Sequence, residues 1–252
     1  MLSGIADPKW TVSAAQVQTG LQGVPRKLSP FDESALECAL KLRDQDPAVR
    51  IHAWLIGSGA ASEEVLARSV AAYRLNQMAC LRIDEQLRWD AHAFARCLGR
   101  WLGGKAERMD AVLMGREFGD LDEGLIAPCL AEVLRWRFAG LIQEVTQKEG
   151  QLMLMRERGE VEEHLSLPSP FLVSITNDKR NRLRHPLMKN LATANKERFA
   201  ATELTLIDAR VRPLSSEDCS SKPGAAACQM IGGNVDAQAD TLAVWLRARL
   251  KR

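Results

Sequence analysis

Apolar and polar positions alternate in blocks through the first 140 residues, and the period of the pattern changes from block to block. Short apolar runs are typical of buried strands, whereas apolar residues spaced three and four apart are typical of helices. The runs that predict strands are residues 9–17, 49–56, 80–83 and 111–114. The stretches that predict helices are residues 30–44, 62–70, 89–102 and 128–134, the first with Ser29 as N-cap and Pro30 in its first turn. Strand and helix therefore alternate, which predicts an α/β fold with a doubly wound, mostly parallel sheet.

The pattern changes after residue 140. Residues 141–145, 151–156 and 161–167 are short strand-like segments joined by glycine-containing turns, which predicts a small β meander. Residues 170–175 return to a buried-strand pattern. Residues 178–198 form a basic stretch that we expect to be largely irregular.

The C-terminal part of the chain differs again. Residues 210–233 are rich in Ser, Pro, Gly and Ala and predict a linker, and residues 237–251 predict an amphipathic helix. We therefore expect an α/β domain over residues 1–209 and a C-terminal arm, made of a linker and a helix, over residues 210–252.

The loop that follows the fourth predicted strand offers the strongest hint of a ligand. It runs from Gly115 to Ile126, is rich in glycine and acidic residues, and leads into a helix that opens near Pro128. Such a connection directs unpaired backbone N–H groups and the positive end of the helix dipole at the loop, where they hold a phosphate without a basic side chain. In a parallel sheet the loops after Val17 and Ile56 would converge on the same edge. The run matches neither GxGxxG nor GxxxxGK[ST], so the alternative that its glycines merely turn the connection stays open.

Composition excludes several classes of protein. The 252 residues are 46% hydrophobic and 26% charged with a net charge of +2, which is ordinary for a globular protein and does not indicate a nucleic-acid partner. No apolar run approaches the roughly 20 residues of a membrane span, and the first residues lack the basic and apolar regions of a signal peptide. The six cysteines form no CxxC pair, which favours free thiols and a cytoplasmic, reducing compartment.

Few residues suggest catalysis or metal binding. The four histidines have no ligand spacing, so we expect no metal site, and no GxSxG or HExxH motif occurs. Asp120 and Asp122 are candidates for Mg²⁺, but acidic residues in such a loop more often cap a helix or face solvent.

The basic stretch over residues 178–198 has two interpretations. It is either a solvated surface or a docking segment, because apolar residues stand among its charges. These apolar residues are Leu183, Leu187, Met188 and Leu191.

Taken in order along the chain, several segments resemble the β subunit of electron transfer flavoproteins. Residues 29–33 resemble the Asn-Pro-Phe-Asp/Cys-Glu helix start of that family, and residues 113–122 resemble its Leu-Leu-Gly-Lys/Arg-Gln-x-x-Asp-x-Asp loop. The strand that ends at Gly57 with the helix after it is similar, and residues 181–186 resemble Asn-x-Pro-Arg-Tyr-Pro. The resemblance extends over residues 10–201.

The chain also departs from this family. The long first hairpin is shortened between Val17 and Ser29, and the Asn-Gln-Thr-Gly stretch at the phosphate is replaced by residues 124–127. Polar side chains are lost there while the backbone N–H groups remain. The lysine-rich segment of the family is diluted at residues 190–196, so the chain resembles a divergent member.

The resemblance implies a Rossmann-like, adenine-nucleotide-binding fold in a subunit that carries electrons and is not itself an enzyme. The redox FAD would lie mainly in an α subunit against this chain, which would hold AMP or a second FAD. Flavin-dependent dehydrogenases would donate the electrons, and the C-terminal helix would pack on the α subunit. The residues implied in nucleotide binding are Ser13, Ser29, Pro30, Phe31, Asp32, Ile56, Gly115, Arg116, Glu117, Phe118, Gly119, Asp120, Leu121, Asp122, Glu123, Gly124, Leu125 and Ile126. Those implied in docking a dehydrogenase are Arg184, His185, Leu187 and Met188.

A rival interpretation is a free-standing adenine-nucleotide-binding or hydrolysing protein of a related α/β fold. Such a hydrolase would need a glycine-rich phosphate grip with Lys or Ser/Thr, and the chain has no Ser-Gly-Gly-x-Asp-Ser or Walker-type run. A co-purifying larger partner and a yellow colour would favour the electron carrier.

Overall fold

The computed structural model describes residues 1–7, 24–57, 61–84, 87, 89–105, 109–120, 122–204 and 230–250. The chain divides into two compact units, Met1–Ser216 and Glu217–Arg252. Each is described by itself.

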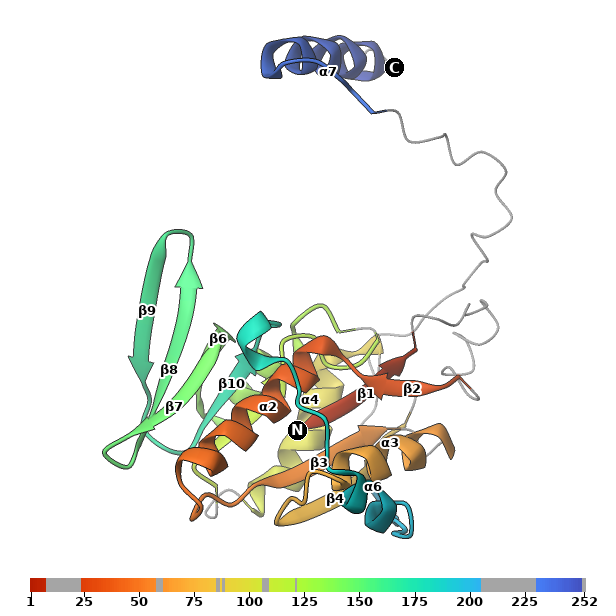
Figure 1. The fold of residues 1–252 in the computed structure, drawn as a ribbon, viewed down its shortest axis with the longest axis vertical. Helices are drawn as coiled ribbons and strands as arrows, with labels where there is room; N and C mark the ends of the chain where they lie inside the picture. Colours follow the sequence, from red (N-terminus) through yellow and green to blue (C-terminus); the bar gives the residue numbers. More distant parts are fainter. Residues whose placement is uncertain are drawn as a thin grey trace. The chain divides into compact units, whose positions relative to one another are not determined.

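The first sheet of the larger unit contains five strands in the order β11-β4-β3-β1-β2 (Figure 1). They are β1 (Leu2–Ala6), β2 (Arg26–Leu28), β3 (His52–Gly57), β4 (Gln77–Arg82) and β11 (Ala201–Glu203). Neighbouring strands are parallel except β2, which is antiparallel to β1. The strand at Leu2–Ala6 was missed by the sequence pattern, and the predicted strand at residues 9–17 lies outside the described residues.

A second sheet continues the parallel architecture. It contains β5 (Ala111–Gly115), β10 (Phe171–Ile175) and β6 (Arg137–Ile142), with β10 in the centre and both neighbours parallel to it. Every residue of β10 is buried, which confirms the buried strand predicted over residues 170–175.

A third, antiparallel sheet forms the predicted meander. It consists of β7 (Glu144–Lys148), β8 (Gln151–Arg158) and β9 (Val161–Ser166), and the β8–β9 hairpin extends away from the parallel sheets (Figure 1). The prediction placed the first meander strand at residues 141–145. This was wrong by a few residues, because those residues span the junction where β6 ends and β7 begins, with Leu141 at a φ of 61°.

Helices cover both faces of the parallel sheets, as expected for a doubly wound fold. The longer helices of this unit are α2 (Pro30–Gln45), α3 (Ala61–Ala71), α4 (Ala91–Gly103) and α5 (Ile126–Leu134). Alternate residues of β10 show the two faces: Leu172 packs in the cluster that contains α4 and α5, whereas Phe171 and Val173 pack in the cluster that contains α2. The α/β class and the mostly parallel, doubly wound arrangement are therefore confirmed.

The basic stretch is more ordered than predicted. It contains the 3₁₀ turn η3 (Lys179–Asn181) and the helix α6 (Met188–Ala194). The sequence pattern missed both because neither is long enough to show a helical period.

The larger unit contains four cysteines, all of which are described. Cys38 and Cys97 are buried and Cys80 and Cys129 are half-buried, with no disulfide among them. Burial raises the pKa of the Cys38 thiol to about 12, so this cysteine behaves as a small apolar side chain.

The smaller unit contains one described helix, α7 (Val235–Leu250), which begins two residues before the helix predicted over residues 237–251 and otherwise overlaps it. Arg249 lies over the ring of Trp245, 4.1 Å from its centroid. Exposed apolar side chains on this helix include Leu242, Val244, Trp245 and Leu246. Among the described helices of the whole chain, none combines the length and the apolar character that a membrane span requires.

Candidate functional site

Asp32 joins the two parallel sheets at the start of α2. Ser29 caps this helix by accepting the Asp32 backbone N–H at 3.0 Å, which confirms the predicted N-cap. The Asp32 carboxylate in turn accepts the backbone N–H of Ser3 in β1 and that of Gly115 at the end of β5, both at 3.1 Å. The predicted residues at the start of α2 and at Gly115 therefore do come together.

A glycine is needed at position 115 because the first turn of α2 lies close to the end of β5. A Cβ at this position would lie 2.7 Å from Asp32 Oδ1, 2.9 Å from the Asp32 backbone nitrogen and 3.0 Å from the carbonyl carbon of Phe31. Burial raises the pKa of the Asp32 carboxyl to about 7, although the hydrogen bonds from Ser3 and Gly115 oppose the shift.

The loop from Gly115 to Ile126 closes on the side chain of Asp122. Its carboxylate accepts the backbone N–H groups of Phe118 at 2.9 Å, Gly124 at 2.9 Å, Leu125 at 2.7 Å and Ile126 at 3.2 Å. Gly124 adopts a φ of 90°, which favours glycine and allows the chain to turn back toward Asp122. Backbone N–H groups that were predicted to bind a phosphate thus donate hydrogen bonds to a carboxylate of the chain itself.

Asp120 holds the other side of the same loop. Its carboxylate forms an ion pair with Arg26 of β2 and accepts the backbone N–H of Ala6 at 2.6 Å. Both candidate Mg²⁺ ligands of the loop, Asp120 and Asp122, therefore have partners within the chain, and Asp122 accepts N–H groups at the start of α5 as the capping interpretation expects. The described residues contain no group of three or more His, Cys, Asp or Glu side chains arranged to hold a metal ion.

A pocket opens between β1, the end of β3 and this loop. Its lining residues are Ser3, Gly4, Ile56, Gly57, Ile83, Phe94, Phe118, Gly119, Asp120, Asp122 and Ile126. Phe94 and Phe118 meet edge to face with their centroids 5.9 Å apart. The larger apolar side chains that line the pocket, which include Ile56, Phe118 and Ile126, are buried. The ionisable side chains among the lining residues are both acidic, so the described part of the pocket does not fit a phosphate at the start of α5.

The pocket includes only some of the predicted nucleotide-binding residues. Ser29, Pro30, Phe31, Asp32, Gly115, Arg116, Glu117, Glu123, Gly124 and Leu125 do not line it, and Ser13 and Leu121 lie outside the described residues. Ser3, Gly4, Gly57, Ile83 and Phe94 line it and are not among the predicted residues. Locating β1 at Leu2–Ala6 would have indicated the first two.

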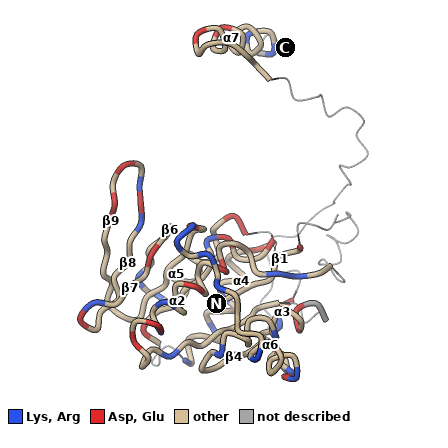
Figure 2. The backbone as a smooth tube through the Cα atoms, in the orientation of Figure 1, with Lys and Arg blue, Asp and Glu red and all other residues tan. Residues whose placement is uncertain are grey.

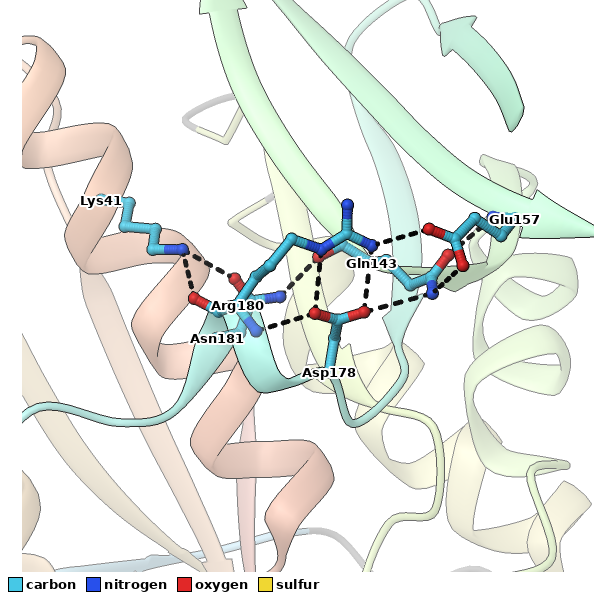
Figure 3. Close-up of polar contacts among 6 residues, drawn as sticks. All are labelled: Lys41, Gln143, Glu157, Asp178, Arg180 and Asn181. Atoms are coloured by element: carbon cyan, nitrogen blue, oxygen red, sulfur yellow. Dashed lines mark hydrogen bonds and ion pairs between the residues drawn. The ribbon is translucent and has the colours of Figure 1, made fainter. Parts of the chain in front are cut away.

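A second feature is the segment from Asp178 to Pro186, which we call the strap. Figure 3 shows its first part: Arg180 pairs with Asp178 and with Glu157 of β8, and the Lys41 ammonium of α2 donates to the Arg180 carbonyl at 2.6 Å. Hydrogen bonds from Arg180 lower the pKa of Asp178 to about 2. The buried Asn181 accepts from Lys41 and donates to the carbonyl of Gln143 between β6 and β7.

The end of the strap is anchored by Arg184. Its guanidinium contacts the Glu37 carboxylate with a shortest distance of 2.7 Å and donates to Asp44 at 2.6 Å. Arg184 was predicted to contact a docking partner, but its side chain is engaged within this chain. Leu183 is also turned inward, against the cluster that contains α2 and α3.

The predicted apolar tip beyond the strap is exposed. Leu187 and Met188, which we call the tip, are 61% and 79% exposed, and Met188 begins α6. His185 is exposed as well. Lys, Arg, Asp and Glu are mixed along the described backbone of the larger unit and do not gather on one face (Figure 2).

Comparison with known proteins agrees with this architecture. A family model described as the electron transfer flavoprotein domain matches residues 20–204. The chain is 25% identical over 231 residues to an electron transfer flavoprotein subunit beta of Syntrophomonas wolfei, which covers 91% of this chain and 87% of that protein. It is 26% identical over 161 residues to the caffeyl-CoA reductase-Etf complex subunit CarD of Acetobacterium woodii, covering 62% of this chain and 59% of that protein. The chain belongs to the electron transfer flavoprotein family, and its similarity to a β subunit extends over most of its length.

Proposed function

We propose that this chain is the β-type subunit of a heterodimeric electron transfer flavoprotein. It pairs with an α-type subunit that holds the redox FAD, and it passes electrons from flavin-dependent dehydrogenases to a downstream acceptor. The observation that carries this proposal is the similarity to a β subunit over 91% of the chain. FAD supplies the electron chemistry, so this chain contributes binding surfaces and positions them.

The tip supports the proposal because an exposed apolar pair on an anchored segment suits a transient interface. Leu187 and Met188 follow His185 and precede Lys189, so cationic or ionisable groups flank an apolar centre. Charges of this kind speed the encounter with an acidic partner surface, while the apolar pair slows dissociation. The occupant we propose is a flavin-dependent dehydrogenase.

A nucleotide in the pocket is the second part of the proposal. The apolar side chains of Ile56, Phe118 and Ile126 support binding of an adenine ring, whereas Asp122 already accepts the N–H groups at the start of α5. We therefore propose that AMP or a second FAD is held through its adenosine part and gains little from a phosphate in this loop.

The C-terminal arm completes the proposed heterodimer. The exposed apolar residues of α7, among them Trp245 and Leu246, support packing of this helix on the α subunit. Removal of residues 210–252 is then expected to weaken the heterodimer and leave the α/β domain folded.

Purification of the chain alone and with a co-encoded larger partner tests the proposal. If the chain is a subunit of an electron carrier, we expect a yellow heterodimer whose flavin is reduced by a dehydrogenase. The rival, a free-standing nucleotide-binding or hydrolysing protein, predicts a stable colourless monomer with ATPase activity.

A further inference from the structure

One face of α2 carries three charged residues that each contact the strap. Glu37, Lys41 and Asp44 are spaced four and three residues apart, so they lie along one side of the helix. We call these three residues the α2 rail. At the start of the strap, Lys41 donates hydrogen bonds to Arg180 and Asn181. At its end, Glu37 and Asp44 accept hydrogen bonds from Arg184.

Arg184 is held at every polar group it has. Its backbone N–H donates to Glu37 Oε2 at 3.1 Å, and its carbonyl accepts the hydroxyl of Tyr73 at 2.8 Å. Its guanidinium Nε and Nη2 donate to the Glu37 carboxylate, and its Nη1 donates to Asp44. Two N–H groups on one carboxylate fix the orientation of the guanidinium as well as its position.

Burial makes the Glu37 contact different from an ordinary surface ion pair. The Glu37 side chain is 6% exposed, whereas the Asp44 side chain is 53% exposed. The hydrogen bonds that Arg184 donates to Glu37 are the main reason that the pKa of Arg184 is raised. Glu37 is therefore the principal anchor of the rail, and Asp44 adds a solvent-screened contact.

The distance from this anchor to the tip is short. Only His185 and Pro186 separate Arg184 from Leu187, which limits the span to roughly 10 Å, and the proline ring fixes one of the intervening φ angles. Where the tip stands relative to the sheets thus depends on where Arg184 is held.

We propose that the α2 rail is a positioning device for the docking tip. By holding Arg184, Glu37 keeps Leu187 and Met188 exposed in one place before a partner arrives, so less conformational entropy is lost on docking. Glu37 and Arg184 are positioning residues in this scheme and touch neither the flavin nor the donor. The inference rests on the proposed docking of a dehydrogenase at the tip.

The test uses the heterodimer carrying Glu37→Gln or Arg184→Lys, with Lys179→Gln as the control. Glutamine at position 37 keeps the shape of the buried side chain but removes its charge. Lysine at position 184 keeps the positive charge but cannot donate two N–H groups to the Glu37 carboxylate in the fixed geometry of a guanidinium. Lys179 is an exposed cation of the same strap, and among the described residues its side chain forms no hydrogen bond or ion pair with α2, so its replacement removes a charge and leaves the α2 rail intact. Two quantities are measured: hydrogen exchange of the amides from residue 182 to 191, and reduction of the flavin by a dehydrogenase that reduces the wild-type heterodimer.

The proposal predicts faster exchange in this segment and a KM for the dehydrogenase that rises about tenfold, with kcat, FAD content and chemical reduction by dithionite unchanged. The Lys179→Gln variant is expected to match the wild type in both measurements. Arg184→Lys should fall between the wild type and Glu37→Gln. If exchange accelerates and KM stays at the wild-type value, the rail does not position the tip and the inference is overturned. If no dehydrogenase reduces the wild-type heterodimer, the proposed function fails, which is a separate result.

Discussion

Replacement of Asp122 by alanine tests how the loop between β5 and α5 is held. The variant removes one carboxylate that accepts four backbone N–H groups, those of Phe118, Gly124, Leu125 and Ile126. The hydrogen bonds from the Phe118 and Ile126 N–H groups are buried, whereas those from Gly124 and Leu125 are only partly buried. Water therefore replaces the carboxylate at some of these donors and not at others.

The expected loss of stability follows from the two buried donors. Leaving a buried hydrogen-bonding group without its charged partner costs about 1.5–3 kcal/mol, and loss of a helix cap alone costs about 1 kcal/mol. One cost of each kind gives a loss of about 2.5–4 kcal/mol in the free energy of unfolding. For a domain of this size that is a fall of about 10 °C in Tm.

The assay is urea unfolding of the purified protein, followed by circular dichroism, with Glu123→Ala as the matched control. Glu123 is an exposed acid beside Asp122 in the same loop, and its replacement is expected to change the free energy of unfolding by less than about 0.5 kcal/mol. A loss below about 1 kcal/mol for Asp122→Ala would refute the reasoning, because the four N–H groups would then need no internal acceptor.

The same two proteins show what the loop does to a nucleotide. In the wild type, adenosine and AMP are expected to raise Tm equally, since the phosphate finds the N–H groups already engaged. In Asp122→Ala the N–H groups are released, so AMP should stabilise more than adenosine. A wild type that is stabilised by AMP much more than by adenosine would contradict the proposed mode of binding.

The remaining predictions concern the sheet junction and the tip. Asp32→Asn should remove one contribution to the pH dependence of stability. The folded-state pKa of about 7 lies above the ordinary 3.8, so the stability that this carboxyl contributes is fully present below about pH 4 and about 4 kcal/mol of it is lost as the pH rises to 7. Urea unfolding of the wild type and the variant at each pH measures the difference. Gly115→Ala should lower the free energy of unfolding by about 1–3 kcal/mol, because the new Cβ meets the first turn of α2, and an unchanged midpoint would contradict the close approach. Changing both Leu187 and Met188 to Ala should slow flavin reduction by the donor dehydrogenase about tenfold in kcat/KM, with heterodimer formation and FAD content intact.

Much of the fold was predictable because the apolar residues of most elements follow a pattern that is clear in the sequence. The apolar run of β10 and the helical stripe of α4 both persist through the whole element, and the structure contains both. Leu2–Ala6 was missed because a five-residue strand with Gly4 at its centre shows no clear period. Its conformation depends on pairing with β3 and β2, which lie far away in the sequence.

The candidate site was predictable in place and less so in mechanism. The glycines of the loop pointed to a close approach, but the group that approaches Gly115 is the first turn of α2 and not a ligand. Local sequence does not show which acceptor a loop N–H finds, and Asp122 satisfies four of them. In the same way, the sequence of the basic stretch does not show which side chains bind within the chain. Arg184 is anchored on α2, whereas its neighbour His185 is exposed.

The measurement that tests the central claim most directly is co-expression of this chain with a co-encoded α-type electron transfer flavoprotein subunit. The account predicts that the two chains elute together as a yellow heterodimer, and that a flavin-dependent dehydrogenase with its substrate bleaches the FAD absorbance. Elution of this chain as a separate, colourless protein in the presence of the folded α-type subunit would contradict it.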